Sequence, residues 1–100
     1  MISVKNSIDQ ILFTVENNQI INHQKQVFAT LKGNEIINSS GQTIMKIDGK
    51  QGISMTDDMP VISHLDNKIR NMNSQVIGKL EGTGSEEEFT LGACSIILYA

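Results

Sequence analysis

The residues best suited to chemistry lie in one stretch of the second half of the chain. Asp57 and Asp58 are adjacent carboxylates, and they are followed by a histidine at His64 and a third carboxylate at Asp66. Paired carboxylates can act as acid and base or hold a cation. No flanking ligand pattern of the EF-hand type is present, so a solvated turn is the simpler interpretation of the aspartates. We keep these four as candidate binding residues because their stretch departs from the regular pattern of the chain.

The other reactive side chains are isolated. His23 and His64 have no cysteine or carboxylate partners at metal-ligand spacing, which argues against a metal site. Cys94 has apolar neighbours and no adjacent histidine, as expected of a packed thiol and not of a nucleophile. The glycines form no phosphate-binding loop. The sequence therefore predicts no catalytic residues, no cofactor and no metal, and it argues against an enzyme.

Composition narrows the possible partners. The chain has 100 residues, a net charge of −3 and four aromatic residues. A basic stripe and stacking aromatics are both missing, so a nucleic-acid partner is not expected. One cysteine, no signal peptide and no run of transmembrane length predict a cytoplasmic protein. The length predicts a single domain over residues 1–100.

A repeat of sixteen residues dominates the chain. Residues 34–49 read NEIINSSGQTIMKIDG and residues 67–82 read NKIRNMNSQVIGKLEG, which agree at seven of sixteen positions. Residues 2–17 and 18–33 follow the same plan, and residues 50–66 form a degraded copy with one extra residue. A fixed period of this kind indicates one small structural unit used several times.

Each unit has the pattern of a β-hairpin. In residues 34–49 a β-branched run is followed by a polar stretch, an alternating apolar and polar run, and a second polar turn. Such runs separated by Asn, Ser and Gly are typical of strands joined by turns. Sixteen residues are too few for a strand, a crossover helix and a parallel strand. The five units therefore predict a mainly β protein, an antiparallel meander of about ten strands.

Alternation along the second strand of each unit assigns its faces. The face expected to point into the core carries Ile11, Phe13 and Val15, then Val27, Ala29 and Leu31, then Thr43, Met45 and Ile47, then Val61, Ser63 and Leu65, then Val76, Gly78 and Leu80. Small residues at Ala29, Ser63 and Gly78 leave room for a thick central element.

The opposite face is expected to meet water, and it includes His64. It also carries one apolar residue per unit, which we call the apolar belt: Leu12, Phe28, Ile44, Ile62 and Ile77. If neighbouring strands cover this belt it is structural, and if they do not it is a subunit or partner interface.

Residues 83–100 leave the repeat. Ser85 followed by Glu88 fits a capping box, in which each side chain bonds the backbone of the other. Glu86 and Glu87 add negative charge to the first turn, where a helix dipole favours it. These signals predict the start of a helix.

The rest of this tail is apolar or small, so a helix over residues 85–99 must be buried on all sides. It would thread the ring of strands and fill a barrel too wide for strand side chains alone. The alternative is a sixth hairpin in an all-β ring, which Gly92, Ile96 and Ile97 support. We favour the helix, and with it a closed or nearly closed barrel.

Three segments carry a resemblance to a known group of proteins. IINSSGQTIMKI at 36–47, IRNMNSQVIGKL at 69–80 and SEEEFTLGACSIILYA at 85–100 resemble the hairpins and the acidic-then-apolar ending of the tubby-like superfamily. That group includes the tubby C-terminal domain, the phospholipid scramblases and the LURP-one-related proteins. The chain is also similar to the small bacterial β-flower repeat proteins. The resemblance is architectural and implies a lipid- or partner-binding module without catalysis.

Two departures from the tubby-like pattern bear on lipid binding. This chain has about ten predicted strands where those domains have twelve, and it lacks the clustered basic residues of their lipid readers. We therefore favour a non-enzymatic binding or structural module that acts through its surface, as a homo-oligomer or with a protein partner. A membrane-surface, phospholipid-binding module is the first alternative, and a small enzyme is the second.

Overall fold

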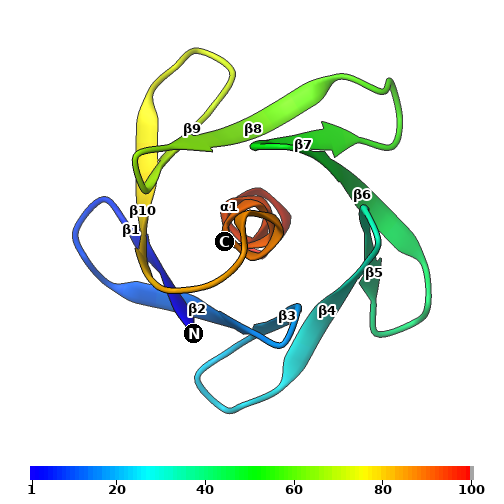
Figure 1. Cartoon of the computed structure of the whole chain (residues 1–100), viewed down its shortest axis with the longest axis horizontal. Coiled ribbons are helices and arrows are strands. Elements are labelled where there is room, and N and C mark those ends of the chain that lie inside the picture. Colours follow the sequence, from blue (N-terminus) through cyan, green and yellow to red (C-terminus); the bar gives the residue numbers. More distant parts are fainter. Residues whose placement is uncertain (100) are drawn as a thin grey trace.

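The protein is a closed antiparallel barrel of ten strands wrapped around one helix (Figure 1). The computed structural model describes residues 1–99. The elements are β1 (Ile2–Asn6), β2 (Ile11–Glu16), β3 (Gln19–Ile21), β4 (Val27–Lys32), β5 (Glu35–Asn38), β6 (Thr43–Asp48), β7 (Gln51–Ser54), β8 (Pro60–Leu65), β9 (Lys68–Arg70), β10 (Val76–Gly82) and α1 (Glu86–Tyr99). The predicted fold class, with a barrel closed around a buried C-terminal helix, is confirmed.

Each strand pairs with its neighbours in the chain, and β1 closes the ring by pairing with β10. The barrel has two different ends. At the turn end, short turns such as Asn17–Asn18 join one hairpin to the next, with φ of 53° and 61° as a type I′ turn requires. At the petal end, five longer loops within the hairpins splay outward from the ring (Figure 1).

The repeated asparagines all make the same loop. In four hairpins the Oδ1 atom of the asparagine accepts hydrogen bonds from the backbone amides two and four residues later, as Asn38 does from Ser40 and Gln42 at 3.0 Å each. Its Nδ2 atom donates to the glutamine four residues on. The four asparagines that share this arrangement are Asn6, Asn22, Asn38 and Asn71. The repeated polar letters therefore encode a loop conformation.

The helix lies along the axis of the barrel, with its N-terminus at the turn end (Figure 1). Its predicted capping box is present: Glu88 N donates to Ser85 Oγ at 3.1 Å, and Ser85 N donates to Glu88 Oε1 at 3.2 Å. The six residues from Thr90 to Ser95 are all buried. A helix without a polar stripe fits here because strands surround it on every side.

In three of the five hairpins a large residue faces a small one on the inner surface, whereas the first and third pair Val4 with Phe13 and Ile36 with Met45. Ile20 lies opposite Ala29, and Ile69 lies opposite Gly78, so that a large residue of the odd strand pairs with a small one of the even strand. In the fourth hairpin this order is reversed, with Gly52 opposite Ile62. Because a Cβ atom on Gly52 would lie 2.5 Å from Cys94 Sγ, the absence of a side chain there makes room for the helix.

The predicted orientation of residues 61–65 is wrong. Ile62 and His64 are buried, at 1% and 8% exposure, whereas Leu65 is 51% exposed. The extra residue of this unit lies in the loop before β8, and a shift of one residue moves every side chain of a strand to the other face. Ile62 therefore belongs to the core and not to the apolar belt, and Ser63 is not one of the small residues facing the helix.

The rest of the belt is half-buried. Leu12, Phe28, Ile44 and Ile77 pack against the core cluster, as does Val61, which takes the place predicted for Ile62. Three residues of the predicted core face, Ile11, Val27 and Val76, are instead about two-fifths exposed, at 41%, 40% and 43%. Each is the first residue of its strand, at the open petal end.

Within residues 1–99, no helix is both long and apolar enough to cross a membrane.

Candidate functional site

A cleft of about 290 Å³ opens at the turn end, between the N-terminal part of α1 and the turn that joins β8 to β9. We call it the turn-end cleft. It is lined by Lys50, His64, Asp66, Asn67, Gly84, Glu86 and Phe89. Two of the four residues singled out from the sequence, His64 and Asp66, are thus brought together in one site.

His64 occupies a position that the other units fill with an aliphatic residue. Its amide donates to the carbonyl of Lys50 at 3.1 Å, as the amide of Leu31 does to Asn18 and that of Leu80 does to Asn67. The side chain therefore points inward, toward the helix. A histidine replaces an aliphatic residue at one point of an otherwise repeated inner surface.

A short chain of hydrogen bonds fixes the His64 ring. Thr90 Oγ1 lies 2.7 Å from the carbonyl oxygen of Gly49 and 2.8 Å from His64 Nε2. The hydroxyl has one hydrogen, which it donates to a carbonyl, so it accepts from Nε2–H. The histidine is then the Nε2–H tautomer, and its Nδ1 atom carries a free lone pair.

The surroundings keep this histidine neutral. Burial lowers the pKa of His64 from its ordinary value of 6.5, the positive charge of Lys50 lowers it further, and the carboxylate of Glu86 acts in the opposite direction. The ring also lies against that of Phe89, with centroids 6.2 Å apart. A neutral imidazole in this place is an acceptor at Nδ1 and not a cation.

Asp57 and Asp58 lie away from the cleft, in the petal loop before β8. Asp57 Oδ1 accepts from the amide of Met59 at 3.3 Å, which is a local turn contact. Asp58 forms an exposed ion pair with Lys46 at 3.1 Å. The two aspartates therefore stabilise their own loop, and they do not join His64 and Asp66 in one site.

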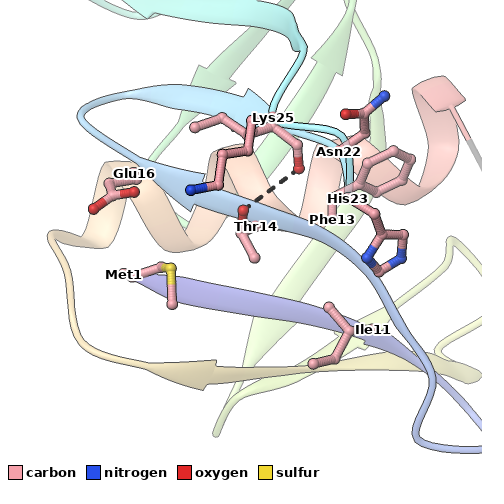
Figure 2. A pocket seen from close by; sticks show the side chains of 9 residues that line it. Met1, Ile11, Phe13, Thr14, Glu16, Asn22, His23 and Lys25 are labelled. Carbon is pink, nitrogen blue, oxygen red and sulfur yellow. Dashed lines mark hydrogen bonds between the residues drawn. The ribbon is translucent and has the colours of Figure 1, made fainter.

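A second groove, of about 390 Å³, lies beside β2, between this strand and the loop that joins β3 to β4 (Figure 2). Its lining includes Ile11, Phe13 and Thr14 on β2, with His23 and Lys25 from the next petal loop. The Thr14 hydroxyl donates to the Ile21 carbonyl at 3.5 Å, the dashed line in Figure 2. Glu16 also lines the groove, but among the described residues no side-chain hydrogen bond or ion pair joins His23, Lys25 and Glu16, so the groove shows no aligned catalytic set.

Cys94 is a fully buried residue of the helix, and its sulfur lies beside Gly52 of β7. Burial raises its pKa to about 12. At neutral pH the group is a thiol, and the thiolate that nucleophilic chemistry requires is not formed. Among the residues that the structure describes, no three histidine, cysteine or carboxylate side chains converge on a possible metal position.

The helix side of the turn-end cleft is not predicted by the sequence. The sequence indicates Glu86 only as part of the helix start and Phe89 only as part of the apolar tail, and it assigns no role to Thr90. The available signal was the phase of the repeat, because an extra residue placed in the loop would have turned His64 inward. The rotation of α1 about its axis brings Thr90 to His64. It cannot be predicted from the repeat, because α1 lies outside the repeated units.

Comparisons of the chain with protein-family models, with curated proteins and with solved structures found no match.

Proposed function

We propose that the protein is a non-enzymatic binding module that acts through its surface, and that copies of the chain associate through their petal ends. The observation that carries this proposal is the distribution of exposed apolar side chains. Most of the large ones lie at the petal end: Ile8, Ile11, Val27, Met55, Met59, Met72, Val76 and Ile97. Within residues 1–99, Met1 and Leu65 are the only large exposed apolar residues at the turn end.

The petal-end residues come from three kinds of element. Ile8, Met55, Met59 and Met72 lie in the splayed loops, with Ile8 72% exposed. Ile11, Val27 and Val76 begin their strands, and Ile97 lies in the last turn of the helix. Ile11, Val27 and Val76 occupy equivalent positions on three strands, and all three are open to water. Such a group of exposed apolar residues indicates a surface that another molecule covers.

Charge favours a second copy as that molecule. The turn end is acidic, because it carries Glu16, Glu35, Asp48, Asp66, Glu86, Glu87, Glu88 and Glu81 (which is paired with Lys5) against Lys32, Lys50, Lys68 and the N-terminal ammonium. The petal end carries both signs in near balance, because Asp9 and Asp58 are paired with Lys79 and Lys46, and Asp57 is offset by Lys25 and Arg70. Two petal ends can therefore meet around a twofold axis without opposing like charges, whereas two turn ends cannot.

Sedimentation velocity over a concentration series tests this association. We expect the wild-type protein to move from monomer to dimer as its concentration rises through the micromolar range. Met72→Lys and Ile8→Lys place charges on two exposed petal loops and should shift the transition to at least tenfold higher concentration. Circular dichroism should show that both variants keep the wild-type fold.

The matched control is Leu65→Lys, which adds the same charge at an equally exposed apolar site on the turn end. It should leave the transition in place. The proposal fails if the wild-type protein stays monomeric at hundreds of micromolar, or if Leu65→Lys weakens association as much as Met72→Lys.

A membrane surface is the second candidate, since apolar loops at one end and acidic groups at the other would orient the barrel on a bilayer. Flotation with vesicles of phosphatidylcholine and phosphatidylserine separates the two proposals. Binding that Met72→Lys abolishes would favour the membrane, and the absence of flotation at low salt would exclude it.

A further inference from the structure

We propose that the turn-end cleft binds an organic cation, an alkylammonium or guanidinium group held by the imidazole of His64 and the carboxylates of Asp66 and Glu86. This site lies at the opposite end of the barrel from the petal surface. It rests on different residues, so it stands or falls independently of self-association.

The first argument is the free nitrogen of a buried ring. His64 is 8% exposed, and within residues 1–99 its only side-chain hydrogen bond is the one from Nε2 to Thr90. No buried side-chain nitrogen or oxygen in the described residues lacks a partner, so Nδ1 must be reached by solvent. The cleft supplies that access. A polar atom on a ring that is otherwise inside the core thus points into an open site.

The second argument is the chemical character of the lining. The Nδ1 lone pair, the Asp66 carboxylate and the Glu86 carboxylate are all acceptors. A ligand that satisfies them must carry several hydrogen-bond donors and a positive charge. Ammonium and guanidinium groups meet both requirements, and the acidic turn end attracts them over longer distances.

The Phe89 ring adds an apolar and aromatic wall to the same cleft. Aromatic faces bind cations, and they also accommodate the methylene chain that precedes an ammonium or guanidinium head. An anion would be repelled by the two carboxylates. The lining therefore selects an organic cation with an alkyl chain.

Lys50 is the one cationic side chain in the lining, and it occupies the position of an internal competitor. Burial is the larger cause of the lowered pKa of His64, and the positive charge of Lys50 adds to it. Removing this charge should leave His64, Asp66 and Glu86 in place. The two carboxylates would then have no cationic side chain of the cleft beside them to compete with the ligand. This gives a variant that is expected to bind more tightly than the wild-type protein.

The test is a titration followed by NMR. Protein labelled with ¹⁵N, at pH 7.5 and a concentration below that of any association, is titrated with agmatine, which carries both cationic groups, or with a blocked arginine. We expect saturable shifts of the His64 ring nitrogens, larger at Nδ1 than at Nε2. If neither probe shifts these signals at 50 mM, the proposal is overturned.

Variants separate a built site from general attraction. Glu86→Gln should weaken binding by roughly fivefold, the effect of one charged hydrogen-bond partner. Glu87→Gln removes the same charge from the neighbouring residue, which does not line this cleft, and should change the affinity less than twofold. Equal losses in the two variants would show attraction by net charge alone and would contradict the proposal.

Lys50→Met provides a test in the other direction, because it should tighten binding by a few-fold. His64→Leu restores the aliphatic residue of the other units and should remove the site while keeping the fold. The two probes distinguish the source of the cation. Binding of agmatine alone points to a free small amine, whereas equal binding of the blocked arginine points to a basic side chain. Unchanged affinity in His64→Leu would overturn the assignment of that ring.

Discussion

At the scale of single residues, the repeated asparagine is the clearest case of sequence encoding structure. Asn38 satisfies two backbone amides with one oxygen and reaches Gln42 with its nitrogen, at 3.3 Å. The same contacts recur at Asn6, Asn22 and Asn71. In the fourth hairpin Ser54 takes the place of the asparagine and bonds one amide, that of Thr56, at 3.2 Å. The one hairpin without this asparagine therefore also has a different loop.

Asn38→Ala should therefore lower the free energy of unfolding by about 1 kcal/mol, the usual net value of such hydrogen bonds. Asn38→Asp keeps the accepting oxygen and loses only the contact with Gln42, so it should cost less. Urea unfolding followed by circular dichroism measures both. An equal cost for the two variants would mean that the backbone contacts of Oδ1 do not stabilise the loop.

His64 makes stability depend on pH. Because its pKa is lowered in the folded state, unfolded chains take up a proton more readily than folded ones below pH 6.5. Stability should be full above pH 6.5 and should fall below it until the pH reaches the folded pKa. His64→Leu should lack this contribution. The measurement is urea unfolding of both proteins at pH 5.5 and 7.5, and an identical pH effect in the two would contradict it.

Cys94 gives a probe of opening. With a pKa of about 12 and no exposed surface, it should not react with Ellman's reagent in the native protein. Labelling should require the helix to leave the barrel, and its rate should follow the equilibrium fraction of open molecules. Adding Asn38→Ala, at a cost of about 1 kcal/mol, should therefore accelerate labelling by roughly fivefold. Rapid labelling under native conditions would show that the helix is not enclosed.

At the scale of elements, the strands leave room for the helix where its side chains come closest. Gly52 and Gly78 both lie where a side chain would collide with the helix, against Cys94 and Ile96. The fourth hairpin reverses the order of the large and small partners that the second and fifth hairpins show, with Ile20 opposite Ala29 and Ile69 opposite Gly78. In the fourth hairpin the large residue lies on the even strand and the small one on the odd strand. The pair therefore fills a similar volume beside the helix.

A swap of the two partners tests this compensation. Gly52→Ile alone should be strongly destabilising, by more than the 1–3 kcal/mol typical of overpacked cores. Combining it with Ile62→Ala gives the order of the second and fifth hairpins and should recover part of the loss. Thermal unfolding of the two single variants and the double variant gives the coupling. Additive effects would mean that Gly52 and Ile62 do not share one space.

At the scale of the whole molecule, the sequence was sufficient for the architecture because the repeat and the helix cap are both local signals. Asn38 and Gly49 recur as Asn71 and Gly82, and Ser85 with Glu88 starts the helix. The cleft was harder to predict. It depends on the register of one strand after an irregular loop, which turned His64 inward, and on the helix rotation that set Thr90 beside it. Neither is determined by periodicity alone.

The two ends of the molecule differ in a way that follows from this construction. Tight turns and the helix start collect the acidic residues at the turn end, while the strand starts and petal loops leave Ile8, Val27 and Met72 open to water. We assign self-association to the petal end and cation binding to the turn end. The two proposed activities therefore use different surfaces of the barrel.

Amide hydrogen exchange measured in dilute and in concentrated protein tests the assignment of the petal end most directly. We predict that concentration will slow exchange in the petal loops around Ile8 and Met72 and in the last turn of the helix near Ile97. Exchange in the turns at Asn17–Asn18 and Asp66–Asn67 should stay the same. Protection confined to the turn end, or no change anywhere in the chain at concentrations where dimers form, would contradict the account.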